Sequence, residues 1–203
     1  MYVPAHFAAP ESLLASLLAS GALCDLVTAG PGGLQSTPLP MLLVDGALQG
    51  HVARNNAQWQ DGGAPALVIV RGPDAYVTPN WYESTRSHGR VVPTWNYQLV
   101  HVHGRLAVHD SPSWTGDLVR RMTARYEAGF EPPWSVEDAP PEFVEGQLRA
   151  IVGVEVAIER IEAKSKLSQN RTAQDAAGVV AGLTSGSARD QAVAEAMRES
   201  FRT

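Results

Sequence analysis

Cysteine is almost missing from this sequence, which holds only Cys24 among its 203 residues. An intrachain disulfide is therefore excluded, and the apolar neighbours of Cys24 favour a small buried side chain over a nucleophile. Positive charge is also scarce, because 16 Lys and Arg residues stand against 21 Asp and Glu residues, for a formal charge of −5. This balance argues against a broadly basic surface that grips nucleic acid.

Long apolar runs are absent as well. No segment approaches the roughly 20 apolar residues that cross a bilayer, and the N-terminus lacks the basic opening of a signal peptide. We therefore expect a cytoplasmic protein without a membrane partner. The sequence has no GxGxxG dinucleotide fingerprint, no GxSxG turn of a serine hydrolase, and no compact HExxH or CxxC pattern.

The chain contains short apolar segments followed by amphipathic helices. Residues 22–71 hold apolar runs broken by Gly, Pro and Asp, and longer alternating strands are expected at 94–104 and 152–164. Helices are expected at 10–21, at 140–151, after the cap Ser111 with Pro112, and after the capping-box pairs Thr172 with Asp175 and Ser187 with Asp190. This order favours an α+β fold centred on an antiparallel barrel over a doubly wound parallel sheet.

Three polar segments mix Arg with hydroxyl and amide groups, at residues 50–59, 72–86 and 166–171. Such groups can bind a phosphate, and Arg can do so through two hydrogen bonds. Flat aromatic surface gathers in the same part of the chain, in Trp59, Trp81, Tyr82, Trp95 and Tyr97. A phosphate joined to a planar ring describes flavin mononucleotide, FMN. The competing interpretation is that the aromatics form a core and the polar residues shape turns.

Two histidines, His101 and His103, fall on one face of the expected strand, roughly 6 to 7 Å apart by the strand rise. With His51 or His109 they could begin a zinc site. Because no metal motif accompanies them, we expect no metal and favour a role at a dimer face or in hydrogen bonding behind a ligand.

Five segments taken in order resemble the PaiB family of FMN-binding negative transcriptional regulators. They are MYVPAHF at 1–7, GHVARNNAQW at 50–59, GPDAYVTPNWY at 72–82, VVPTWNYQLVHVHG at 91–104 and KLSQNRTAQDAAGVVAGL at 166–183. The resemblance implies an antiparallel split β-barrel, as in pyridoxamine phosphate oxidases, with peripheral helices and a helical C-terminal tail. It further implies a homodimer with flavin between the subunits. We expect the FMN-binding domain at 1–170 and a helical extension of it at 171–203.

The resemblance also implies which residues bind the cofactor. The phosphate candidates are Arg71 and the turn that contains Thr78, Trp81, Ser84 and Arg86, while Thr94, Trp95 and Asn96 are candidates for the ring or ribityl chain. The residues expected to complete or brace the site are Arg54, Asn55, Gln169, Asn170 and Arg171. The chain departs from the family pattern at Thr85, where Lys is usual, and the adjacent Arg86 is the candidate replacement for that cation.

Three functions are consistent with this sequence. The first is a flavin-binding regulatory protein, the second a flavin-dependent oxidoreductase or haem-handling enzyme of the same superfamily, and the third a dimeric binding module without cofactor. DNA enters as a partner only through the family resemblance. Residues 172–203 suggest a helix-turn-helix in outline, yet Arg189, Arg198 and Arg202 are balanced by acidic neighbours, which leaves a poor electrostatic footprint.

Overall fold

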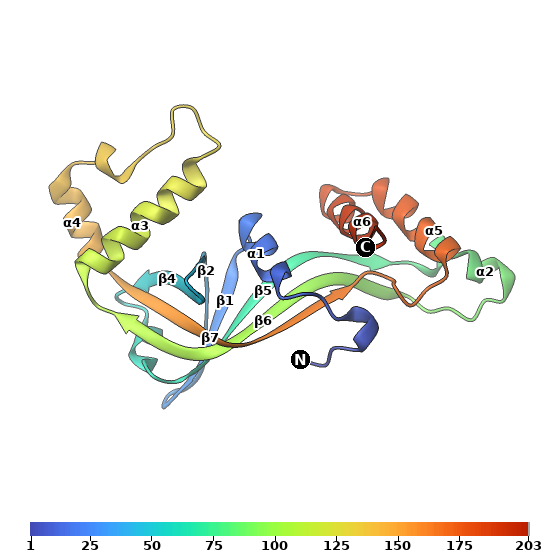
Figure 1. Ribbon diagram of the computed structural model, residues 1–203, viewed down its shortest axis with the longest axis horizontal. Coiled ribbons are helices and arrows are strands. Elements are labelled where there is room, and N and C mark those ends of the chain that lie inside the picture. The colour runs from blue at the N-terminus through green and yellow to red at the C-terminus, as the bar shows by residue number, and fades with distance from the viewer. Residues whose placement is uncertain (203) are drawn as a thin grey trace. The chain divides into compact units, whose positions relative to one another are not determined.

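The computed structural model describes residues 1–202 and combines an antiparallel sheet with helices (Figure 1). Within these residues seven strands form a sheet in the order β2-β1-β5-β6-β7-β4-β3. The strands are β1 Cys24–Gly30, β2 Gly33–Leu39, β3 Leu42–Val44, β4 Ala47–Ala53, β5 Pro65–Val77, β6 Thr94–His109 and β7 Ile151–Lys166. The α-helices are α1 Ser12–Ala19, α2 Glu83–Ser87, α3 Pro112–Glu127, α4 Pro141–Arg149, α5 Ala173–Thr184 and α6 Ala188–Ser200. The expected α+β class is confirmed.

The chain forms two compact units. Unit 1 comprises Met1–Leu13, Arg71–Val100 and the C-terminal segment from Glu162, whereas unit 2 comprises Leu14–Val70 and His101–Ile161. The expected boundary at residue 170 stays a prediction. Among the described helices, none combines the length and the apolar character that crossing a bilayer requires.

The sheet of unit 2 is built from antiparallel pairs with a defined register. Cys24 of β1 lies opposite both Leu39 of β2 and Val70 of β5. A Cβ atom added at Gly104 of β6 would lie 2.1 Å from the carbonyl oxygen of Ala157 in β7. Glycine is therefore needed at this position because the two backbones approach so closely.

Unit 1 holds a core between its strands and the two C-terminal helices, α5 and α6, which lie side by side (Figure 1). The buried residues of this core are Ala75, Val77, Tyr82, Leu167, Val179, Leu183, Val193, Ala194, Ala196 and Met197. Trp81, in the short 3-10 helix Pro79–Trp81 (η3), packs on α5 at two glycines. A Cβ at Gly178 would lie 2.0 Å from the Trp81 carbonyl oxygen, and one at Gly182 would lie 2.3 Å from its ring.

The helix caps in the structure agree only in part with those predicted from the sequence. The capping box of Ser187 and Asp190 is confirmed, since each side chain binds the other residue's backbone N–H. Thr172 accepts a hydrogen bond from the Asp175 N–H as expected, but the Asp175 carboxylate accepts hydrogen bonds from a different segment, described below. Ser111 is the N-cap residue of α3 and Pro112 begins the helix, as expected, but the Ser111 hydroxyl makes no capping hydrogen bond and lies 3.0 Å from the hydroxyl of Ser113.

Candidate functional site

Unit 1 contains a cavity of about 540 Å³ at β5, β6 and the start of α6. Its lining comprises Arg71, Gly72, Asp74, Trp95, Tyr97, Gln98, Leu99 and Arg189. Small-molecule sites in proteins usually enclose about 300 to 1,000 Å³ and combine apolar walls with a few polar groups. The cavity therefore has the size and the mixed lining of a cofactor site.

Aromatic side chains form one wall of this cavity. Because side chains alternate along β6, Trp95 and Tyr97 share one face, while Asn96 points to the other and is fully buried. Trp95 is 50% exposed, and its ring centroid lies 6.1 Å from that of Tyr76 in an edge-to-face arrangement. Flat surface that remains open in this way can stack against a planar ligand.

Guanidinium groups form the polar part of the lining. Arg189 of α6 donates a hydrogen bond of 3.1 Å to the Asp74 carbonyl oxygen and forms an ion pair with the Asp74 carboxylate. Arg71 of β5 brings a second guanidinium to the same cavity. Arginine suits the recognition of phosphate because its planar fork can donate two parallel hydrogen bonds.

A third cation, Lys166 of β7, links two of the residues expected in the site. Its Nζ donates to the Thr94 hydroxyl at 2.6 Å and to the carbonyl oxygen of Trp95. Burial lowers the pKa of Lys166, and the positive charges of Lys164 and Arg171 lower it further. An anion bound nearby would relieve this repulsion. Sequence reasoning missed Lys166 as a site residue, because nothing in its spacing reveals that the amine reaches Thr94.

The turn after β5 is held by hydrogen bonds. Thr78 caps the 3-10 helix by accepting from the Asn80 N–H. Ser84 donates to the Asp175 carboxylate twice, from its backbone N–H at 2.8 Å and its hydroxyl at 2.7 Å. Desolvation raises the pKa of Asp175, but the bonds from Ser84 and Thr172 and the charge of Arg171 outweigh it, so that the pKa is lowered. Ser84 thus ties the turn to α5.

Arg86 and Thr85 occupy the positions where the sequence departs from the PaiB pattern. The Arg86 guanidinium lies 2.9 Å from the Glu83 carboxylate, and its side chain is 70% exposed. The Thr85 hydroxyl donates to the carbonyl oxygen of Pro79. Neither side chain lines the cavity.

The remaining candidates of unit 1 do not line the cavity, and three of them contact other residues of the same unit. The Asn96 amide donates to the Ser168 hydroxyl at 3.0 Å. Gln169 accepts from the Leu167 N–H and donates to the Ser165 carbonyl oxygen, which shapes the end of β7. Arg171 lies 4.7 Å from the ring centroid of Tyr82, and Asn170 is exposed.

The other two candidates, Arg54 and Asn55, belong to unit 2. Arg54 forms an ion pair with Asp110 and donates to the carbonyl oxygens of Arg149 and Ile151, at 2.7 and 3.2 Å. Asn55 is exposed. Arg54 therefore anchors the strand ends of its own unit.

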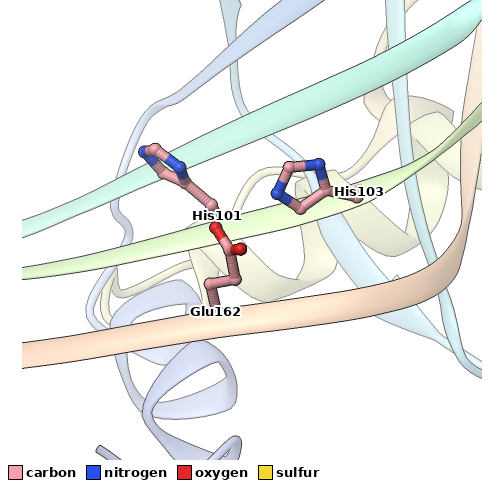
Figure 2. Close-up of side chains that lie close together, drawn as sticks. All are labelled: His101, His103 and Glu162. Carbon is pink, nitrogen blue, oxygen red and sulfur yellow. The ribbon is translucent and has the colours of Figure 1, made fainter. Parts of the chain in front are cut away.

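The histidines weighed as zinc ligands lie on different parts of unit 2. His101 and His103 both lie on β6 (Figure 2), and their ring centroids are 6.3 Å apart, in line with alternation along the strand. His109 stacks on Trp114 with centroids 4.0 Å apart, and its Nε2 lies 3.7 Å from the Glu155 carboxylate. His51 lies on β4 and lines a separate cavity.

Comparison with known proteins identifies the family. Residues 1–160 match the family described as "Putative FMN-binding domain". The chain belongs to this family. It is 30% identical to the uncharacterized protein AN0679 of Emericella nidulans, an alignment that covers 98% of this chain and 97% of the relative. It is 35% identical to the protease synthase and sporulation protein PAI 2 of Bacillus subtilis, over 66% of this chain and 62% of that protein.

A solved structure confirms the fold expected for this FMN-binding family. The FAD and heme binding protein of Mycobacterium smegmatis superposes with a TM-score of 0.60 at 17% sequence identity, over 83% of this chain and 77% of the other. The predicted split-barrel fold and the predicted PaiB relationship are thus both confirmed. The family match includes the β5 and β6 walls of the cavity but ends before Lys166 and Arg189. Two cations of unit 1 therefore come from outside the matched residues.

Proposed function

We propose that this protein binds FMN in the cavity of unit 1 and acts as a PaiB-type flavin-binding protein. The observation that carries the proposal is the joint lining of the cavity by Trp95, Tyr97 and Arg71. FMN has a planar tricyclic ring and an anionic phosphate, so a site for it needs flat apolar surface beside cationic donors. When bound, the flavin would supply one-electron and two-electron redox chemistry.

The lining suggests a role for each part of the site. Arg71 binds the phosphate, and Trp95 and Tyr97 contact the ring. Lys166 adds positive charge at Thr94, which favours the anionic cofactor over an uncharged ring. Most of the other predicted residues act as positioning residues, since Thr78, Trp81, Ser84, Asn96, Gln169 and Arg171 hold the turn, strand ends and helices of this unit. Direct contacts from Arg54, Asn55 and Arg86 stay predictions.

The proposal includes a homodimer. The described part of unit 1 exposes five large apolar side chains, namely Tyr2, Tyr76, Val92, Trp95 and Phe201. A second copy of the chain that covered this surface would remove it from water and would shield the cavity that Trp95 lines.

The proposal also includes a cytoplasmic location, which the single cysteine supports. DNA remains a partner implied by the family alone. In the C-terminal helices Arg189 pairs with Asp74 and Arg198 with Glu195, so these guanidinium groups are already engaged by carboxylates. We therefore assign flavin binding, and not DNA binding, to the features of unit 1.

The test compares FMN with riboflavin, which lacks the phosphate, by titration monitored through flavin fluorescence. We expect Arg71→Ala to weaken FMN binding about 10- to 100-fold, the value of a charge-assisted hydrogen bond, and to leave riboflavin affinity unchanged. Arg105→Ala, an exposed arginine of unit 2, is the matched control and should bind both ligands as wild type does. Equal losses for both ligands in Arg71→Ala would refute the phosphate assignment, and no FMN uptake by wild type would refute the function.

The same preparation separates the other functions considered for this chain. Turnover of NADPH by the loaded protein would favour an oxidoreductase. A mobility shift that is selective for DNA sequence and sensitive to salt would favour direct regulation of transcription.

A further inference from the structure

Unit 2 contains a separate cavity of about 220 Å³. Its walls are aliphatic and aromatic side chains from α3, α4, β7 and the loop between the helices, and its polar groups are His51 and Gln147. No Asp, Glu, Lys or Arg of the described chain lines it. Because an uncompensated charge is costly in apolar surroundings, such a lining selects an uncharged ligand.

We propose that this cavity binds a small uncharged aromatic molecule with one hydroxyl group, a monocyclic phenol, whose hydroxyl forms a hydrogen bond with His51. The volume fits this class of ligand. An apolar cavity of about 150 Å³ holds benzene, so a cavity of about 220 Å³ accepts a ring with one or two substituents. The rings of Trp134 and Phe143 in the lining offer flat surface for aromatic packing.

His51 supplies the specific contact. Within residues 1–202, no hydrogen-bond partner of the His51 imidazole is found, although this side chain is half-buried. Burial lowers the pKa of His51, so the ring is neutral at pH 7 and has one donor and one acceptor nitrogen. A hydroxyl group, which both donates and accepts, can pair with either nitrogen.

The cavity is held by the elements around it. Side chains alternate along β4, so His51 points away from the buried Val52 and toward the face that α3 and α4 cover. Gly153 lies opposite His51 in β7, and the Trp114 ring fills the space where a Cβ of Gly153 would stand. An ion pair of 2.7 Å between Arg120 and Glu137 ties α3 to the loop that carries part of the lining. These contacts shape a cavity before any ligand arrives.

The test uses 4-methylphenol as the probe and toluene as its analogue without the hydroxyl group. We expect wild type to bind 4-methylphenol about two- to tenfold more tightly than toluene in calorimetric titrations, as one net hydrogen bond allows. In His51→Leu this preference should disappear while toluene still binds. That loss of discrimination is a result that a merely structural role for His51 would not give.

Two variants test the location. Val144→Phe on α4 and Ala139→Leu in the preceding loop both place extra carbon atoms in the cavity, and each should abolish binding of both probes. The control is Phe130→Ala, an exposed side chain of unit 2 outside the lining, which should bind as wild type does. The same variants should bind FMN with the affinity of wild type. A failure of the phenol proposal can therefore be distinguished from a failure of the flavin proposal. No binding of either probe by wild type, or binding that survives both filling variants, would overturn the inference.

Discussion

The packing of Trp81 on α5 makes a quantitative prediction for Gly178→Ala. In a helix interior this change normally stabilises a protein by about 1 kcal/mol, because Ala loses less backbone entropy than Gly. Here the new Cβ would lie 2.0 Å from the Trp81 carbonyl oxygen, far inside a normal contact of about 3.5 Å. The obstacle is backbone, which cannot change rotamer to make room.

The expected size follows from these two opposing effects. The cost of overpacking a close contact is about 3 kcal/mol at the upper end of the usual range. The higher helix propensity of Ala offsets about 1 kcal/mol of this cost. We therefore expect a net loss of about 2 kcal/mol in the free energy of unfolding. For a chain of this length that loss corresponds to a decrease in Tm of about 4 to 8 °C, measurable by circular dichroism and by urea denaturation.

Gly146→Ala is the matched control. Gly146 also lies inside a helix, α4, but a Cβ there meets no heavy atom within 4 Å. This variant should be more stable than wild type by about 1 kcal/mol, as helix propensity alone dictates. Opposite signs for the two substitutions are the expected result. A stabilising effect of Gly178→Ala would refute the packing of α5 on Trp81.

Three further predictions concern individual side chains. Asp175→Asn should lower the free energy of unfolding by about 1 to 3 kcal/mol at pH 7, because its hydrogen bonds with Ser84 are weakened. Since the pKa of Asp175 is lowered in the folded protein, the extra stability of wild type should shrink as the pH falls below about 4. A stability difference that does not change with pH in urea titrations would contradict this. Burial raises the pKa of the Cys24 thiol to about 11, so iodoacetamide at pH 8 should label it only after unfolding, as judged by mass spectrometry. Arg54→Lys should lower the temperature at which unit 2 unfolds, since an ammonium cannot reproduce the planar fork that binds Asp110 and two carbonyl oxygens together, and unchanged thermal unfolding would refute this role.

Local patterns in the sequence predicted the elements well. Alternation at residues 94–104 predicted most of β6, and the pair Ser111 and Pro112 predicted the start of α3. Caps were predicted less well, because several groups compete for each hydroxyl or carboxylate. Asp175 could have completed a box with Thr172, but its carboxylate accepts from Ser84, which lies 91 positions away in the chain. Such a partner is set by tertiary packing and leaves no local signal.

The sequence predicted residues of the candidate site only where they lie close together in the chain. Trp95 and Arg71 line the cavity, and both were expected from the family resemblance. Arg189 and Lys166 were not named as site residues, since the contacts of Arg189 with Asp74 and of Lys166 with Thr94 join segments far apart in the chain. Conversely, Ser84 and Asn96 carry polar groups that suit a ligand, yet they form hydrogen bonds with Asp175 and Ser168. Residue type alone does not distinguish a side chain that contacts a ligand from one whose hydrogen bonds stabilise the fold.

The most direct test of the flavin site is the binding of FMN to purified wild type and to Trp95→Ala, followed by the change in flavin absorbance. We expect one FMN per chain at micromolar affinity or tighter, and about tenfold weaker binding when the indole is removed from the cavity wall. Trp134→Ala, which removes a half-exposed indole from unit 2, should leave FMN affinity unchanged. Equal affinity of wild type and Trp95→Ala for FMN would show that the flavin does not bind against the Trp95 wall of this cavity.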